Sequence, residues 1–453
     1  MMMDFYEMTM SYGYFRQTHG DVRVAFDLFF RSVPDRGGYA VFAGLEHVIE
    51  FVENLSFSDE DIDYFRAQNL FSEEFLSFLR GFRFRGDIYA VPEGTIIYPN
   101  EPLMTIVAPI IDAQLIETAI LAQINHQSLI ATKASRIVRA AEGRKVSDFG
   151  ARRAHNMDAA TYGARAAYIG GVDMTATVSA GQQFGIPISG TMAHSWVMFF
   201  EDEFTAFKKY AELYPQATVL LVDTYDVIHS GIPNAIRTAH EVLAPQGHRL
   251  AGVRIDSGDL AYLSKRVRTM LDDAGLTDCK IILSNSLDEF TISSLLLQGA
   301  QVDSFGVGER LITAKSDPVF GAVYKLVAVE KDGVFAPRIK MSENVEKLTN
   351  PGIKDLYRIY DRHGKAVADM LALQGEEIDL TKPFRYVDPR KPWKNRFFEG
   401  FSAVNLRRLY VRSGKRVEQL PTLEEIRCYV QKQLAEEIWP EEQRFENPHR
   451  HYL

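Results

Sequence analysis

Short apolar runs that end abruptly in polar residues recur through the middle of the chain, and this pattern limits the fold more than any other feature. The run over residues 250–255 is followed at once by Asp256, Ser257, Gly258 and Asp259. The same transition occurs after the runs over residues 145–149, 186–189, 218–222, 281–283 and 302–305. Amphipathic stretches separate these runs. Strands that alternate with helices predict βα units and a parallel sheet.

The stretch after Asp259 shows the helical period clearly. Apolar residues recur there at intervals of roughly 3 to 4, which is the spacing of one buried helix face. They are Leu260, Leu263, Val267, Met270 and Leu271, and Gly275 then supplies a stop signal. Polar groups follow nearly every predicted strand, whereas an open parallel sheet concentrates its ligands at one switch point. We therefore predict a (β/α) barrel. Some of these polar residues would instead be simple helix N-caps.

The two ends of the chain have a different character. Residues 1–113 mix aromatic-rich helical segments with extended runs on either side of a Pro92-Glu93-Gly94 turn. Residues 328–453 again contain strand-like segments. We predict a barrel domain over residues 114–327 and a peripheral α+β domain formed from both chain ends, with a C-terminal extension.

Composition excludes several classes of protein. The 453 residues carry a formal net charge of −9, which argues against a nucleic-acid partner because neutralising phosphates requires a basic face. The two cysteines, Cys279 and Cys428, provide no disulfide framework. We find no signal peptide and no apolar stretch of about 18 residues, the length that a membrane helix requires. The sequence thus predicts a cytoplasmic protein that does not enter the membrane.

His194 is the strongest candidate for chemistry. It follows a predicted strand among small residues, and Asp223 follows the next strand. A histidine in this setting is a base, a phosphoryl acceptor or a hydrogen-bonded structural group. Asp223 would hold one ring nitrogen so that the other is nucleophilic. Metal binding by His194 is disfavoured because no HxxxH or CxxC spacing accompanies it.

Two other groups suggest phosphate and cation binding. Gly306 and Gly308 would let the backbone approach a phosphate closely, although a tight strand-to-helix turn explains them equally well. Arg254, Lys315 and Lys325 would add positive charge. The paired carboxylates of Asp256 and Asp259 would hold Mg²⁺ on a polyphosphate or a ribose diol, or cap a helix.

Five ordered blocks together resemble the nicotinate phosphoribosyltransferases, which are type II phosphoribosyltransferases. The blocks cover residues 4–10, 148–155, 190–195, 254–259 and 305–308, and the resemblance runs from Asp4 to Lys325. It implies the irregular (β/α) barrel of that family. The last block departs from the family's pattern, because Glu309 stands where a small hydroxyl residue is common.

The resemblance implies an ATP-hydrolysing enzyme of NAD salvage. Such an enzyme transfers phosphoribosyl from 5-phosphoribosyl-1-pyrophosphate to nicotinate and releases nicotinate mononucleotide and pyrophosphate. His194 would become phosphohistidine, oriented by Asp223, and Mg²⁺ would lie at Asp256 and Asp259. Tyr6 from a second subunit and Phe149 would sandwich the pyridine, so that the enzyme works as a homodimer with shared sites. The remaining implied contacts are Arg152 and Asp173 for nicotinate, and Arg254, Asp256, Ser257, Gly258, Gly306, Gly308 and Lys325 for phosphoribosyl pyrophosphate.

Three alternatives compete with this interpretation. A nicotinamide phosphoribosyltransferase would share the histidine but bind an uncharged amide, so arginines such as Arg152 or Arg153 would lack a carboxylate to bind. A quinolinate phosphoribosyltransferase would share the barrel but need no ATP, which leaves His194 unexplained. A non-catalytic sensor of phosphorylated metabolites would not require His194, Asp223 and Asp256 together.

Overall fold

The computed structural model describes residues 2–18, 20–340, 349–376, 379–387 and 392–449. The chain forms two compact units. The first unit combines Met1–Leu129 with Val319–Leu453, and the second is Ile130–Pro318. The first division falls inside helix α6 (Glu117–Ala140) rather than near residue 113. A continuous helix keeps one apolar period, so its sequence carries no mark of such a boundary.

The second division falls before strand β12 (Val323–Lys331) rather than after residue 327. This strand pairs with β1 (Arg23–Phe29) of the first unit. Local sequence indicates that a segment is extended but not which distant strand it pairs with. The boundary near residue 319 depends on the pairing of β12 with β1, so it could not be placed from the sequence.

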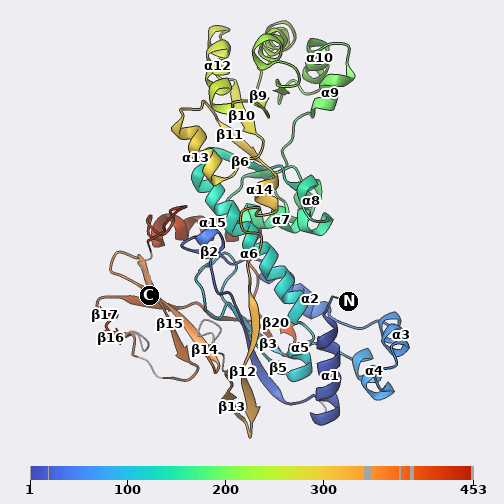
Figure 1. Cartoon of the computed structure of the whole chain (residues 1–453), viewed down its shortest axis with the longest axis vertical. Coiled ribbons are helices and arrows are strands. Elements are labelled where there is room, and N and C mark those ends of the chain that lie inside the picture. The colour runs from blue at the N-terminus through green and yellow to red at the C-terminus, as the bar shows by residue number, and fades with distance from the viewer. Residues whose placement is uncertain (1, 19, 341–348, 377–378, 388–391, 450–453) are drawn as a thin grey trace. The chain divides into compact units, whose positions relative to one another are not determined.

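The second unit contains a six-stranded parallel sheet of order β7-β6-β11-β10-β9-β8 (Figure 1). Its strands are β6 (Lys145–Asp148), β7 (Met174–Thr175), β8 (Val219–Leu221), β9 (Gly252–Ile255), β10 (Lys280–Ser284) and β11 (Ser304–Val307). The last strand, β11, pairs with the first, β6, as a barrel requires. An isolated parallel bridge between Thr175 and Ile188 extends the edge beyond β7. The predicted irregular (β/α) barrel is confirmed.

The strand register brings the polar tips to one edge of this sheet. Arg254 of β9 pairs with Leu221 of β8, and Gly306 of β11 pairs with Ser284 of β10. Helix α12 (Leu260–Asp273) follows β9 and buries Leu260, Val267 and Leu271, as its apolar spacing predicts. The carboxyl ends of parallel strands therefore present their following loops together.

The first unit contains an antiparallel sheet built from both chain ends. Its seven strands have the order β13-β12-β1-β5-β3-β19-β20. Those not yet placed are β13 (Val334–Pro337), β5 (Met104–Pro109), β3 (Asp87–Ala90), β19 (Arg408–Arg412) and β20 (Lys415–Arg416). The predicted peripheral α+β domain is thus present, because N-terminal and C-terminal strands share hydrogen bonds.

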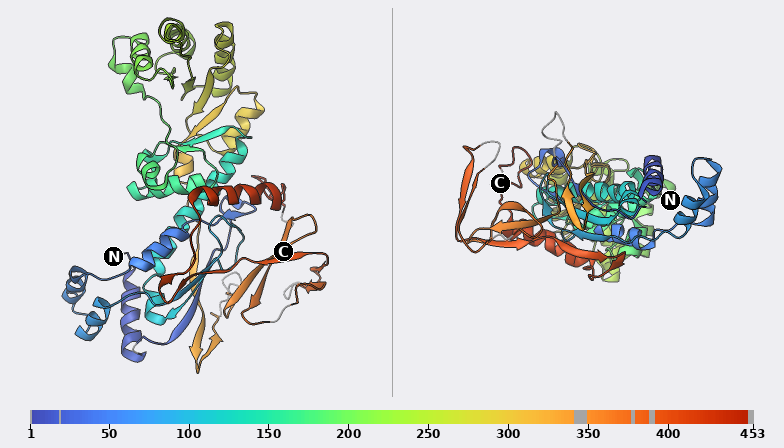
Figure 2. Two further views of the ribbon diagram at one scale, coloured as in Figure 1. Left: turned by 180° about the vertical axis from the view of Figure 1, so that it is seen from behind. Right: turned by 90° about the horizontal axis from the view of Figure 1, so that it is seen from below.

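Smaller elements complete the first unit. A three-stranded sheet, β15 (Ala366–Leu373), β14 (Lys354–Tyr360) and β18 (Ser402–Asn405), lies beside the hairpin β16 (Phe384–Val387) and β17 (Asn395–Phe398), as both views in Figure 2 show. Phe398 of the hairpin packs against Ile359 and Val367 of this sheet. The helices are α1 (Phe5–Thr18), α2 (Leu45–Asn54), α3 (Asp59–Ala67), α4 (Glu73–Arg80), α5 (Ile110–Gln114) and α15 (Leu423–Lys432). Among the described residues, none of the helices combines the length and hydropathy that a bilayer crossing requires.

A buried ion cluster stabilises the second unit, and its carboxylate allows a test. Glu289 of α13 (Glu289–Leu297) is fully buried and lies 2.8 Å from Lys133 Nζ and 2.8 Å from Arg136 Nε, both on α6. We expect Glu289→Gln to lower the free energy of unfolding by about 3 to 5 kcal/mol, because it removes a buried negative charge that faces two buried cations. Urea unfolding of this variant measures the change. Glu212→Gln, on an exposed pair with Lys208, is the control, and an equal effect of both changes would contradict the role of burial.

Candidate active site

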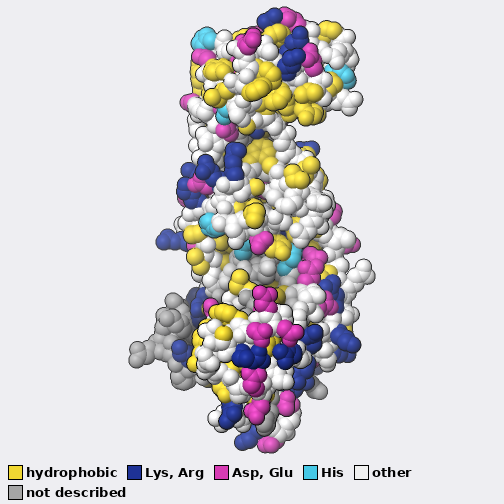
Figure 3. Space-filling view, turned by 90° about the vertical axis from the view of Figure 1, so that its right-hand side faces the viewer, with side chains coloured by type: hydrophobic (Ala, Val, Ile, Leu, Met, Phe, Trp, Pro, Cys, Tyr) yellow, Lys and Arg dark blue, Asp and Glu magenta, His cyan; other side chains and the backbone are white. Residues whose placement is uncertain are grey.

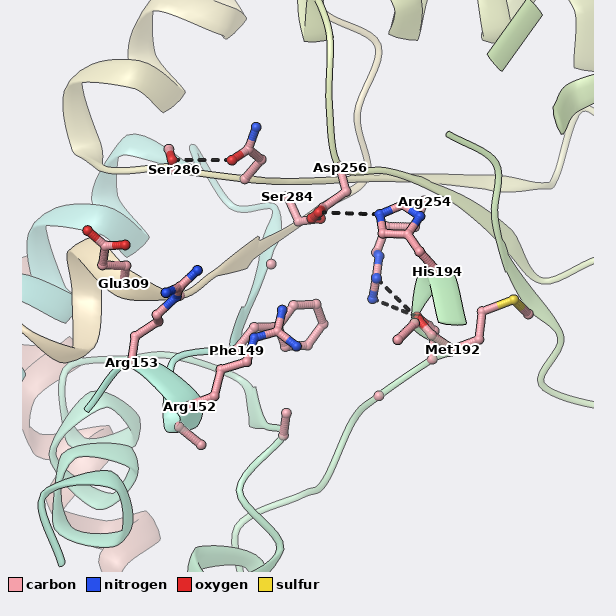
Figure 4. A pocket seen from close by; sticks show the side chains of 18 residues that line it. Phe149, Arg152, Arg153, Met192, His194, Arg254, Asp256, Ser284, Ser286 and Glu309 are labelled. Atoms are coloured by element: carbon pink, nitrogen blue, oxygen red, sulfur yellow. Dashed lines mark hydrogen bonds and ion pairs between the residues drawn. The ribbon is translucent and has the colours of Figure 1, made fainter. Parts of the chain in front are cut away.

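A cavity of about 470 Å³ opens in the second unit at the edge where the strand tips meet (Figure 4). Loops after β6, β9, β10 and β11 and the segment before helix α9 (His194–Phe199) line it. The lining residues are Phe149, Ala151, Arg152, Arg153, Ala176, Gly190, Thr191, Met192, Ala193, His194, Arg254, Asp256, Ser284, Asn285, Ser286, Gly306, Gly308 and Glu309. Residues from positions 149 to 309 thus converge on one concave surface, which is the usual setting of a ligand site.

Some of the residues singled out from the sequence line this cavity, and others do not. Phe149, Arg152, His194, Arg254, Asp256, Gly306 and Gly308 line it. Asp223 lies beneath His194, and Ser257 contacts Asp223. Tyr6 and Lys325 belong to the first unit, on α1 and β12.

His194 has different neighbours at its two ring nitrogens. Nε2 lies 4.0 Å from Oδ1 of Asp223 and 3.9 Å from Oδ2 of Asp256. Nδ1 lies 3.1 Å from the hydroxyl oxygen of Thr224. The Asp223 distance exceeds a hydrogen bond, so the hydrogen-bond partner of the ring is Thr224 rather than the carboxylate that sequence reasoning selected.

Hydroxyl and amide groups hold both carboxylates beside His194. Oδ2 of Asp223 accepts hydrogen bonds from the Ser257 hydroxyl at 2.6 Å and from the backbone N–H of Asp256 at 3.1 Å. Oδ1 of Asp223 is buried and has no hydrogen-bond partner among the described residues. The Ser284 hydroxyl donates to Oδ1 of Asp256. Each carboxylate therefore keeps its other oxygen directed toward Nε2 of His194.

Arg254 brings a fixed positive charge to the cavity. Its guanidinium donates to the Thr191 hydroxyl at 2.7 Å and to the carbonyl of Met192 at 3.2 Å. Its Cζ lies 5.8 Å from the centre of the Phe149 ring. Burial lowers the pKa of the guanidinium, with Asp256 and Asp223 opposing the shift. An arginine side chain remains charged even with a lowered pKa, so the guanidinium of Arg254 is suited to binding an anion.

Phe149 stands directly above Gly306, and this contact requires glycine. A Cβ at position 306 would lie 2.4 Å from Cε2 of Phe149. The backbone N–H of Phe149 donates to the carbonyl of Val307 at 2.8 Å, which fixes the base of the ring. Behind it, the buried carboxylate of Asp148 accepts from the N–H of Gly150 and the hydroxyl of Thr175, both at 2.8 Å. Burial raises the pKa of Asp148, and these hydrogen bonds oppose the rise.

Gly306→Ala is expected to displace the Phe149 ring and to raise the KM for an aromatic substrate by about 3- to 10-fold, the value of a lost aromatic contact. Steady-state kinetics with nicotinate measures this. Gly13→Ala, where an added Cβ meets no atom within 4 Å, is the control. An unchanged KM in Gly306→Ala would show that Phe149 does not contact the substrate.

Glu309, which follows the phosphate-loop candidate Gly308, lies on the opposite side of the cavity from His194 (Figure 4). Gly308 precedes the short helix α14 (Glu309–Ile312). Glu309 pairs with Lys315 at 2.6 Å, and this lysine is the main cause of the lowered pKa of the Glu309 carboxyl. The negative charge of Glu309, the residue that departs from the family's pattern, is thus paired with the positive charge of Lys315.

Two predicted residues have other partners. Asp259 caps α12 by accepting from the N–H of Tyr262 at 3.0 Å, and it does not line the cavity. Asp173 accepts from the N–H of Val146 at 2.9 Å and likewise does not line the cavity. Within the described ranges, no cluster of three or more His, Cys, Asp or Glu side chains has the arrangement of a protein-only metal site.

Sequence reasoning assigned no role to several residues of the site. Thr191 holds Arg254, Thr224 holds His194 and Ser284 holds Asp256. Asn285 and Ser286 line the cavity with positive φ angles of 96° and 49°, a conformation that non-glycine residues rarely adopt. All five lie in the polar segments that follow predicted strands, and that position was the only signal available.

Comparison with known proteins agrees across the whole chain. Family models described as the nicotinate phosphoribosyltransferase (NAPRTase) N-terminal domain, the NAPRTase family and the nicotinate phosphoribosyltransferase C-terminal domain match residues 1–125, 144–349 and 353–453. A nicotinate phosphoribosyltransferase of Bacillus subtilis is 47% identical over 98% of this chain and 90% of the relative. One of Caenorhabditis elegans is 35% identical over 99% of this chain and 90% of the relative.

Solved structures give the same result. The crystal structure of human nicotinic acid phosphoribosyltransferase superposes with a TM-score of 0.89 at 29% identity, covering 99% of this chain and 97% of that one. A nicotinate-nucleotide pyrophosphorylase of Pyrococcus furiosus superposes with a TM-score of 0.72 at 25% identity, covering 96% and 94%. Similarity of this extent in sequence, fold and domain order shows that the chain belongs to the nicotinate phosphoribosyltransferase family.

Proposed function

We propose that the chain transfers phosphoribosyl from 5-phosphoribosyl-1-pyrophosphate to the ring nitrogen of nicotinate at the cavity of the second unit, with ATP hydrolysis coupled through His194. The observation that carries this proposal is the convergence of Phe149, Arg254, Asp256 and His194 on one cavity. An aromatic face, a half-buried cation and carboxylates are the groups that a pyridine, a pyrophosphate and a ribose require.

Arg254 and Phe149 serve the transfer step. The pyridine nitrogen attacks C1 of the sugar, the bond from C1 to the pyrophosphate oxygen breaks, and pyrophosphate leaves with the bonding pair. Negative charge accumulates on the leaving group, so the half-buried guanidinium of Arg254, held by two hydrogen bonds, stabilises the transition state. Phe149 holds the pyridine in line with C1, which favours attack through orientation. Arg152 and Arg153 add positive charge for the nicotinate carboxylate and the phosphates.

The carboxylate of Asp256 fits a site for Mg²⁺ shared with substrate. Mg²⁺ usually binds one or two carboxylates together with substrate phosphates, and Asp256 presents one carboxylate to the cavity. Mg²⁺ held there supplies further positive charge to the departing pyrophosphate. Asp259 is occupied by helix capping, so Asp256 is the residue we assign to this role.

His194 serves the ATP-coupled step. A ring nitrogen attacks the γ-phosphorus of ATP, a P–N bond forms, the bond to the bridging oxygen breaks, and ADP leaves with the bonding pair. The phosphoryl group adds negative charge next to Asp256 and changes the relative affinities of substrates and products. Hydrolysis of the P–N bond by water then restores the free histidine.

Exposed hydrophobic side chains support a homodimer. Figure 3 shows such side chains gathered on the visible face of the second unit, where α8 (Val178–Phe184), α9 and α10 (Glu203–Leu213) expose Val178, Met198, Phe199 and Leu213. Helix α1 exposes Phe5, Tyr6 and Met10 in the first unit. Apolar patches on a protein surface commonly mark protein–protein contacts. We propose that Tyr6 stacks on the pyridine bound at the site of a neighbouring subunit. Lys325 would contact the phosphate of the phosphoribosyl group at that same site.

Mixing Tyr6→Ala with His194→Ala tests the shared site. Each variant alone is expected to be nearly inactive in the ATP-coupled reaction. Random exchange of subunits should restore about a quarter of the sites, because half of the dimers are mixed and each has one intact site. Mixed and refolded samples are assayed for ATP-stimulated mononucleotide formation. No recovery in mixtures that contain mixed dimers would contradict sharing.

One assay tests the proposed function against its alternatives. Mononucleotide formation is measured with nicotinate, nicotinamide or quinolinate as the acceptor, each with and without ATP. We expect nicotinate to react and ATP to increase its rate or yield. Preference for nicotinamide or quinolinate, or absence of turnover, would favour one of the other enzymes or a sensor. We further propose a cytoplasmic location, where these phosphorylated substrates are present.

A further inference from the structure

Thr224 lies at the ring nitrogen of His194 that faces away from both carboxylates. Its hydroxyl oxygen is 3.1 Å from Nδ1, whereas Asp223 and Asp256 lie near Nε2 at 4.0 and 3.9 Å. The side chain of His194 is 40% exposed, and the residue is the first of the short helix α9. Among the described residues, the contact with Thr224 is the only hydrogen bond that the His194 ring makes.

The loop that carries Thr224 is anchored on both sides. Before it, Asp223 is held by the hydroxyl of Ser257 and the N–H of Asp256. After it, Asp226 caps the helical segment Val227–Gly231 by accepting from the N–H groups of Ile228 and His229 at 2.9 and 2.8 Å. The backbone that carries Thr224 is thereby held in place, so ordering this loop costs little additional entropy when the bond forms.

That helical segment is itself fixed against the end of strand β8. A Cβ at Gly231 would lie 1.9 Å from the carbonyl oxygen of Val222, so only glycine allows this approach. The segment has π-helical geometry, which is rare and frequently occurs at functional sites. The loop over residues 223–226 therefore has a defined path between a strand end and a helix.

A hydroxyl suits this position better than a carboxylate. Threonine both donates and accepts a hydrogen bond, so it can contact Nδ1 whether or not that nitrogen carries a proton. A carboxylate only accepts and would hold one protonation state. The Thr224 hydroxyl can thus keep the ring in one orientation throughout a cycle in which its protonation changes.

We propose that Thr224 is a positioning residue that holds the His194 ring through Nδ1 and so directs it for phosphoryl transfer. Its catalytic consequence rests on the proposed function of His194. The positioning contact itself does not, because it joins two side chains of this chain. Among the described residues, no other hydroxyl forms a hydrogen bond with Nδ1 of His194.

Substitutions at position 224 test the proposal in the full-length protein. Thr224→Val is expected to slow phosphohistidine formation from ATP about 5- to 10-fold, the value of one hydrogen bond of about 1 kcal/mol. The ATP-independent rate and the nicotinate KM should change by less than about 2-fold, because the groups that bind nicotinate remain in place. Thr224→Ser should restore phosphorylation. Thr269→Val, which removes an exposed hydroxyl bonded only within α12, is the matched control.

A spectroscopic measurement tests the contact without ATP. The ¹⁵N chemical shift of His194 Nδ1, assigned by comparison with His194→Gln, should move in Thr224→Val and remain near the wild-type value in Thr224→Ser and Thr269→Val. An unchanged shift in Thr224→Val overturns the proposal, as does an equal loss of phosphorylation in the Val and Ser variants. If wild-type protein forms no phosphohistidine, the proposed function of His194 fails, and the ¹⁵N shift still decides the role of Thr224.

Discussion

Replacing Arg254 with methionine is expected to lower kcat/KM for mononucleotide formation by about 10²- to 10³-fold, the effect of removing a preorganised group that stabilises transition-state charge. Two of its nitrogens are held by the Thr191 hydroxyl and the Met192 carbonyl, and its Nε has no partner among the described residues. The guanidinium is therefore held in place by the protein itself and retains a donor, Nε, that is not used by these contacts. Methionine keeps the volume of the side chain and removes the charge.

Arg254→Lys refines this prediction. Lysine keeps the positive charge, so we expect a smaller loss of kcat/KM than in Arg254→Met. A loss remains, because lysine has no rigid fork that contacts the Thr191 hydroxyl and the Met192 carbonyl at the same time. Arg249→Met, at an exposed pair with Asp278, is the control for loss of one arginine. Steady-state kinetics with varied phosphoribosyl pyrophosphate separates the cases. If kcat/KM decreased by less than about 3-fold in Arg254→Met, the charge of Arg254 would not act in the transition state.

Replacing His194 with glutamine is expected to abolish phosphoenzyme formation and to lower the ATP hydrolysis rate by about 10³-fold or more, since it removes the nucleophile. Glutamine is polar and can still contact Thr224, so the surrounding site should persist. Mononucleotide formation without ATP should remain measurable, because Arg254, Phe149 and Asp256 are unchanged.

Phosphate release and acid-labile ³²P incorporation measure the effect of His194→Gln. Asp223→Asn should lie between this variant and the wild type, because it removes a charge 4.0 Å from Nε2 but leaves the nucleophile. His240→Gln, at an exposed helical position, is the control. Full ATP stimulation in His194→Gln would contradict the coupling role.

Local patterns in the sequence were sufficient to predict the elements around the site. The apolar run before Asp256 became β9, and the helical spacing after Asp259 became α12. The position of Gly306 at the end of the last barrel strand followed from the same alternation of strands and helices. These features depend on neighbours in the chain, so the sequence carries them directly.

The contacts of the polar groups could not be predicted in the same way. Asp256 and Asp259 looked equivalent in sequence, yet one lines the cavity and the other caps a helix. Asp223 was expected to hold the His194 ring, but Thr224, one residue later, makes the hydrogen bond. Such distinctions depend on side-chain direction at the end of a strand, and a shift of one residue reverses that direction.

By itself, the sequence determined that polar residues stand at the ends of parallel strands and that the chain carries the motifs of its family. Only the tertiary structure decided which of these residues meet. Strand register places Ser284 against Asp256, and the path of the loop after β8 places Thr224 against His194, although 28 and 30 residues separate the members of each pair. Register depends on packing between strands that are distant in the chain, and local composition therefore cannot specify it.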